Sequence, residues 1–110
     1  MTKDELRQYR SIKIEICQIE RRVREMEERT DDIGVRKALG SFYRQKIAEL
    51  MECQLKIEKA IESLEPIERE LIRLRYIDGL EWLEVAEVIH YEWTQTHRIH
   101  ARALAKLKDL

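Results

Sequence analysis

Residues 80–108 read LEWLEVAEVIHYEWTQTHRIHARALAKLK, and their apolar pattern decides the fold. Two apolar stripes of helical period, one within 80–89 and one within 93–108, are separated by the turn His90-Tyr91-Glu92. Ala86 stands four residues before that turn, and its small side chain lets two helices approach closely at a steep angle. A helix pair with this short connection predicts a helix-turn-helix.

A third short helix is expected just before this pair. Pro66 suits the first turn of a helix and disfavours helix at the residue before it, so a helix is predicted from about Ile67 to Ile77. Asp78-Gly79 supplies the turn that follows. The next two helices are then expected over Leu80–Ile89 and Trp93–Lys108. Residues 64–110 are therefore predicted to form a trihelical domain.

The N-terminal part is predicted to be a long helical hairpin. From Asp4 to Arg29 the apolar residues follow the 3/4 spacing of a coiled-coil-like helix, and they are Tyr9, Ile12, Ile16, Ile19, Val23 and Met26. Breaks are expected at residues 30–34 and at Gly40-Ser41, with Ser41 as N-cap of a second helix that runs to about Ser63. The fold class is thus all-α: a hairpin over residues 1–63, then a helix-turn-helix domain over 64–110.

The second helix of this hairpin is apolar on two flanks. One flank is a 3/4 stripe of Ile47, Leu50, Ile57, Ile61 and Leu64, interrupted by Gln54 at a core-type position. The other flank holds Ala48, Met51 and Leu55. A helix with two apolar flanks has to cover both, so packing on the first helix and also on the C-terminal part or a second subunit is expected.

Composition and cysteine spacing narrow the function classes. The 110 residues carry 21 Lys+Arg and 22 Asp+Glu, and no apolar run approaches a membrane span or a signal-peptide core. A cytoplasmic protein without membrane contact is therefore expected. Cys17 and Cys53 form no CxxC pattern and are expected to be small buried thiols.

The balanced charge hides a local split that points to DNA. Residues 80–92 contain four acids and no Lys or Arg, whereas residues 93–108 contain four bases and no acid. A helix of this polarity suits phosphate, so double-stranded DNA is the expected partner. The expected base contacts are Thr94, Gln95, His97 and Arg98, and the expected phosphate contacts are Arg102 and Lys106. Arg98 and Arg102 have no acid four residues away in their own helix, which favours an external anion.

Residues 64–107 resemble region 4 of bacterial sigma factors. The matching elements stand in the family's order: Glu68-Arg69, Leu71-Ile72, Leu74-Arg75-Tyr76, Gly79-Leu80, Val85-Ala86 and Ala103-Leu104-Ala105-Lys106-Leu107. Over most of its length the chain also resembles small phage-type transcriptional regulators. The resemblance implies that Trp93, Thr94 and Arg98 read bases and that Arg102 lies nearer the phosphates. His90, Glu92 and Thr96 depart from the family, in which Gly, Ser or Thr, and Val or Ile are common at these places.

No catalytic residue, metal site or cofactor is expected. His97 and His100 stand three residues apart but lack a third ligand at suitable spacing, and no nucleophile–base pair or Gly-rich phosphate loop is present. Two function classes stay open beside DNA-binding regulation. One is a module that docks on RNA polymerase or a sigma factor without touching DNA; the other is a coiled-coil protein with a vestigial DNA-binding domain. A homodimer through the N-terminal helices is also left open.

Overall fold

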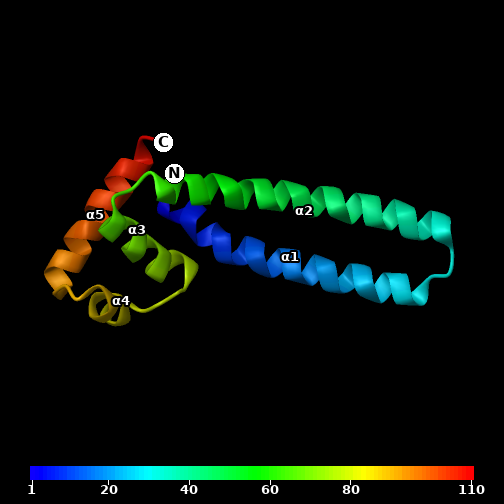
Figure 1. Ribbon diagram of the computed structural model, residues 1–110, viewed down its shortest axis with the longest axis horizontal. Coiled ribbons are helices and arrows are strands. Elements are labelled where there is room, and N and C mark those ends of the chain that lie inside the picture. Colours follow the sequence, from blue (N-terminus) through cyan, green and yellow to red (C-terminus); the bar gives the residue numbers. More distant parts are fainter.

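The computed structural model describes residues 1–110 and consists of helices without any strand. The elements are α1 (Lys3–Arg29), α2 (Ile33–Glu62), α3 (Pro66–Ile72), the π-helical turn η1 (Arg73–Ile77), α4 (Trp82–Ile89) and α5 (Trp93–Lys108). Figure 1 shows α1 and α2 as a long hairpin, with the short helices gathered at the end where both chain termini lie. The predicted all-α class, a helical hairpin followed by a helix-turn-helix, is confirmed.

The predicted stripe of α1 forms the inner face of the hairpin. Ile12, Ile16 and Ile19 are buried against α2, and the stripe loses cover toward the hairpin tip, where Val23 and Met26 are only half-buried. Thr2 caps the helix, because its side-chain oxygen accepts a hydrogen bond from the backbone N–H of Glu5 at 3.3 Å. Spacing alone predicted this helix and its buried face.

The expected break at Gly40-Ser41 is wrong, since α2 is one continuous helix from Ile33 to Glu62. Asp32 supplies the N-cap, accepting a hydrogen bond from the backbone N–H of Val35 at 3.1 Å. A single glycine costs a helix only about 1 kcal/mol relative to alanine, and one packed partner helix offsets that cost. Gly40 is buried within this continuous helix, and a Cβ added there would approach only the flexible guanidinium of Arg44.

The expected helix over 67–77 is divided into α3 and η1. Pro66 stands in the first turn of α3 as predicted. The backbone N–H of Asp78 bonds to the carbonyl of Arg73 at 2.8 Å, a π-type spacing, and this adds a residue to the last turn. Gly79 then reverses the chain with φ of 75°, and α4 begins at Trp82 instead of Leu80. The bounds of α5 agree with the expected ones.

One hydrophobic core joins the hairpin to the short helices. Its 16 buried residues come from every helix, and they include Leu6 of α1, Ile61 of α2, Leu71 of α3, Val85 of α4 and Leu107 of α5. Tyr9 adds a hydrogen bond from its hydroxyl to Glu58 at 2.8 Å. The proposed division at residues 63 and 64 stays a prediction about folding units, and the two parts share this core.

One expectation about side-chain burial in the hairpin is wrong: Cys17 and Cys53 are both exposed, because each lies outside the seam that α1 and α2 share. The second flank of α2 is not covered within the chain, since Met51 is 49% exposed and Leu55 is 52% exposed. Cover by a second subunit, the other expected alternative, stays a prediction. No helix is both long and apolar enough to cross a membrane.

Candidate nucleic-acid interface

The turn between α4 and α5 is closed by a left-handed residue. His90 has φ of 60° and ends α4, and the backbone N–H of Tyr91 bonds back to the carbonyl of Ala86 at 3.2 Å. Glycine adopts this conformation without strain, which explains the family's preference for it at this place. Figure 1 shows that the turn sets α5 at a steep angle to α4, as a helix-turn-helix requires.

The two faces of α5 are cleanly separated. Five residues face the core and are buried: Thr96, Ile99, His100, Ala103 and Leu107. The opposite face is exposed over more than three turns, and its residues are Thr94, Gln95, Arg98, Ala101, Arg102 and Ala105. Four of the predicted contact residues, Thr94, Gln95, Arg98 and Arg102, therefore lie on one continuous exposed strip.

Ala101 and Ala105 belong to this strip and were not selected from the sequence. Thr94, Arg98, Ala101 and Ala105 step by four, three and four residues, so the spacing alone placed them on one helix face. Charge and polarity, which indicated the other contact residues, do not distinguish an alanine that faces DNA from one that faces water. Their small side chains allow a groove floor to approach the backbone of α5 closely.

His97 is not part of the exposed strip. Its ring centre lies 4.7 Å from that of Trp82 and 4.5 Å from that of Trp93, so the imidazole is held between two indoles. Its Nε2 is buried and has no hydrogen-bond partner. Trp93 itself is 51% exposed beside this stack. His97 thus lies between Trp82 and Trp93, apart from the other expected base contacts.

A second histidine, His100, lies deeper in the same stack. Its Nε2 is 2.7 Å from the hydroxyl of Tyr76, and its ring centre is 4.5 Å from that of Trp82. Burial, reinforced by nearby Lys3 and other cationic groups, lowers the pKa of His100 to about 4. The ring is therefore neutral at physiological pH. Arg75 also lies over the Trp82 ring, with its guanidinium carbon 4.9 Å from the ring centre.

Arg102 and Lys106 have an acidic partner that the sequence did not indicate. The carboxylate of Glu68 is fully buried; it accepts from Nε of Arg102 at 3.1 Å and from Nζ of Lys106 at 2.8 Å. It also accepts from the backbone N–H of Glu65 at 3.1 Å. Burial would raise the pKa of Glu68, but these hydrogen bonds outweigh it and hold the pKa below its ordinary value. The expected absence of acidic partners holds within α5 and fails across elements.

This ion pairing changes what the two bases can offer. Arg102 keeps 55% of its side chain exposed and Lys106 keeps 42%, so both still reach solvent beside Glu68. Nε of Arg102 is occupied, whereas its outer N–H groups are not bonded within the chain. Arg98 is exposed and forms no ion pair within the chain. It is thus the least committed cation of the strip.

Acids near the start of α4 have a local role. The carboxylate of Glu84 accepts a hydrogen bond from the backbone N–H of Glu81 at 3.4 Å. The side chain of Glu81 in turn accepts from the backbone N–H of Glu84, and the two together form a capping box. Glu92 takes the N-cap place of α5 without a side-chain hydrogen bond. Part of the charge split between the two helices therefore reflects helix capping.

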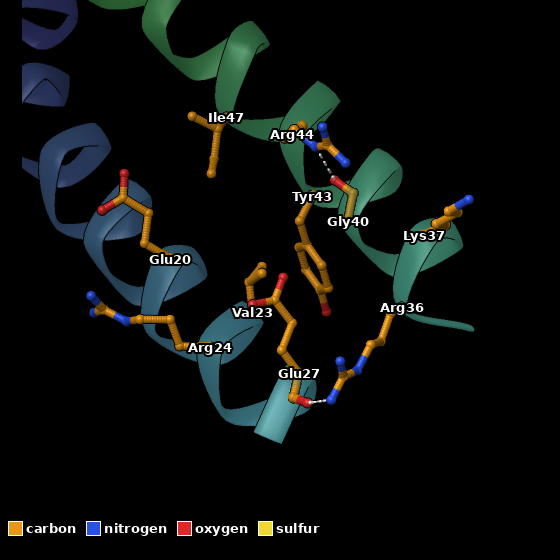
Figure 2. A pocket seen from close by; sticks show the side chains of 10 residues that line it. All are labelled: Glu20, Val23, Arg24, Glu27, Arg36, Lys37, Gly40, Tyr43, Arg44 and Ile47. Atoms are coloured by element: carbon orange, nitrogen blue, oxygen red, sulfur yellow. Dashed lines mark hydrogen bonds between the residues drawn. The ribbon is translucent and has the colours of Figure 1, made fainter. Parts of the chain in front are cut away.

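The hairpin holds a separate hollow of about 570 Å³ near its tip. Figure 2 shows Val23 of α1 and Tyr43 of α2 pointing into the space between the helices. The guanidinium of Arg36 is bonded to the backbone carbonyl of Glu27, and that of Arg44 to Gly40, so two of its cations serve the hairpin itself. No group of three or more potential metal-binding side chains occurs in the chain.

Comparison with known families finds a match in the C-terminal part of the chain. Residues 60–109 match the sequence model of the family described as Sigma-70, region 4. The match runs from the end of α2 through α5 and covers Glu68, the turn and the exposed strip. No curated protein and no solved structure matches the chain. Residues 60–109 are therefore a sigma region 4-like helix-turn-helix, a DNA-binding type of domain.

Proposed function

We propose that this protein is a sequence-specific regulator of transcription, of phage or prophage type, that reads double-stranded DNA with α5. The observation that carries the proposal is the exposed strip of α5, which combines Thr94, Gln95 and Arg98 with small residues and contains no acid. Such a strip fits a major groove, whose floor offers hydrogen-bonding base edges. The family match of residues 60–109 supports the same function.

The contact residues are proposed in two groups. Thr94, Gln95 and Arg98 contact base edges, with Trp93 beside them at the start of the helix. Arg102 and Lys106 contact phosphates through the N–H groups that Glu68 leaves free. His97 was expected among the base contacts; its place between Trp82 and Trp93 supports an indirect role, in which it fixes the position of Trp93.

The remaining features of the proposal concern context. The protein acts in the cytoplasm without a cofactor and without catalysis, its folding units divide near residues 63 and 64, and it pairs as a homodimer through the N-terminal hairpin. A two-fold dimer would present two copies of α5 to a pseudo-palindromic site.

Titration of a fluorescently labelled duplex, followed by anisotropy, tests DNA binding. Neutralising three phosphates predicts a slope of about -3 in a plot of log K against log salt. Arg98→Ala is expected to weaken binding by about 10-fold or more, since a good base contact is worth about 1–3 kcal/mol. Lys46→Ala is the matched control, because Lys46 is an exposed cation on the hairpin. Equal affinities for both variants would contradict the assignment of α5.

A second candidate function is docking on RNA polymerase or a sigma factor without DNA contact. The outer face of α4 favours it, because Leu83 is 68% exposed and Val88 is 48% exposed next to Glu84 and Glu87. Apolar side chains ringed by acids suit a protein partner with basic residues. Absence of binding to any duplex at low salt, with a folded protein, would favour this candidate over the first.

A further inference from the structure

The outer face of α2 carries an acidic pair followed by a basic pair. Glu49 and Glu52 precede Lys56 and Lys59 along α2, and all four are exposed. Lys56 and Lys59 also border a hollow with Met1 and Glu5, beside the start of α1. None of the four forms an ion pair within the chain. The chain therefore leaves two adjacent patches of opposite charge without an internal partner.

Apolar side chains flank these charges. Met51 is 49% exposed and Leu55 is 52% exposed, and no other element of the chain covers them. A shallow hollow of about 270 Å³ lies here, lined by Glu49, Glu52, Cys53, Leu55, Lys56 and Lys59. An exposed apolar flank beside unpaired charges of both signs is typical of a surface that meets a partner.

We propose that this face binds the same face of a second copy, with the two α2 helices antiparallel about a two-fold axis near residue 54. The spacing carries the argument: the midpoint of residues 52 and 56 is 54, and so is the midpoint of residues 49 and 59. An antiparallel pair in that register sets Glu52 against Lys56 of the second copy and Glu49 against Lys59. A two-fold interface uses each contact twice, so the acidic patch of each copy meets the basic patch of the other.

The charges also decide the direction of the pair, whereas Leu55 and Cys53, two residues apart in α2, point to different sides of the helix and do not fix the register. A parallel pairing would instead set Glu52 against Glu52 and Lys56 against Lys56, and like charges oppose each other there. The charge order thus selects the second copy as occupant and selects its direction.

The dimer would leave the DNA-binding strip free. Residue 54 lies eight residues, about 12 Å, from the end of α2 at Glu62, so the two helix-turn-helix parts stand on opposite sides of the axis. The proposed interface lies on α2, whereas the exposed strip lies on α5. This interface deepens the proposed homodimer and does not depend on DNA binding.

Charge reversal tests the pairing by sedimentation velocity without DNA. The wild type is expected to dimerise reversibly, and Glu49→Lys/Glu52→Lys or Lys56→Glu/Lys59→Glu should each weaken the dimer by at least 10-fold. An equimolar mixture of the two variants should restore association, because each then supplies the charge that the other lost. Glu15→Lys/Glu28→Lys on α1 changes the net charge equally and should leave the dimer intact.

Two outcomes would overturn the proposal. One is a wild type that stays monomeric at several hundred micromolar; the other is a dimer that persists in both reversed variants. Circular dichroism verifies that the variants fold, which is expected because all substituted side chains are exposed. Anisotropy with labelled duplex is measured separately, so loss of the dimer and loss of DNA binding are distinguished.

Discussion

At the scale of single residues, Glu68 ties α3 to α5 through a fully buried carboxylate. Glu68→Ala removes the acceptor for Arg102, Lys106 and the backbone N–H of Glu65, and should lower the free energy of unfolding by about 2–3 kcal/mol. Glu68→Gln keeps a neutral acceptor and should cost about 1–2 kcal/mol, because both bases are exposed enough to regain water. Urea denaturation measures the difference; equal stabilities of the wild type and Glu68→Ala would refute a stabilising role.

His100 makes stability depend on pH below neutrality. Its pKa is about 4 in the folded protein against an ordinary value of 6.5, so between these values the unfolded chain binds the proton and the folded one does not. Stability is therefore lost as pH falls from 6.5 to 4, by up to about 3 kcal/mol. Lys3 and Arg7 of α1, Arg75 of η1 and His97 all disfavour the proton.

Thermal melts at several pH values test this titration. His100→Gln can still hydrogen-bond to Tyr76 but does not titrate, so its melting temperature should fall less between pH 6.5 and 4 than that of the wild type. Acidification also protonates carboxylates whose pKa is lowered, such as Glu68, and removes the stability that their hydrogen bonds supply. This loss of stability is the same in the wild type and in His100→Gln. Parallel pH profiles would show that His100 does not carry the difference.

At the scale of elements, two glycines should respond to alanine with opposite signs. A Cβ at Gly40 would approach the guanidinium of Arg44 at 3.2 Å, and that flexible end can move, so Gly40→Ala should stabilise α2 by about 0.5–1 kcal/mol. Gly79 has φ of 75° and its missing Cβ leaves room for Arg10, so Gly79→Ala should cost about 1–2 kcal/mol or more. Urea denaturation of both variants measures these changes. If both variants were stabilised, or both destabilised, the roles assigned to the two glycines would be contradicted.

The same elements show how far sequence reasoning reached. Periodicity and turn residues predicted the all-α class, the buried face of α1 and the bounds of α5, because these depend on neighbours within four residues. The break at Gly40 was wrong since α1 supports α2 across it. The buried thiols were wrong because Cys17 and Cys53 lie just outside the seam. The link from Glu68 to Arg102 joins elements 34 residues apart, and no local pattern carries such a pairing.

At the scale of the whole molecule, the hairpin and the helix-turn-helix meet in one core but differ in how well they are packed. The molecule measures 60 × 27 × 19 Å, so the distal hairpin projects well beyond the other helices. Near its tip the seam residues Val23, Met26 and Tyr43 are only half-buried. Lasting order in the distal part therefore depends on the shared core at the base.

Leu6 makes this coupling measurable in the full chain. It is fully buried between α1 and the short helices, so Leu6→Ala should cost about 2–5 kcal/mol. Both tryptophans, Trp82 and Trp93, lie in the helix-turn-helix, whereas most helical residues lie in α1 and α2. A single cooperative unit predicts that tryptophan fluorescence and circular dichroism show the same midpoint and shift together in Leu6→Ala. Val23→Ala, at the half-buried seam, should lower the free energy of unfolding by only about 1 kcal/mol, so both midpoints should move less than in Leu6→Ala. If the midpoint measured by fluorescence were unchanged in Leu6→Ala, residues 64–110 would instead fold on their own.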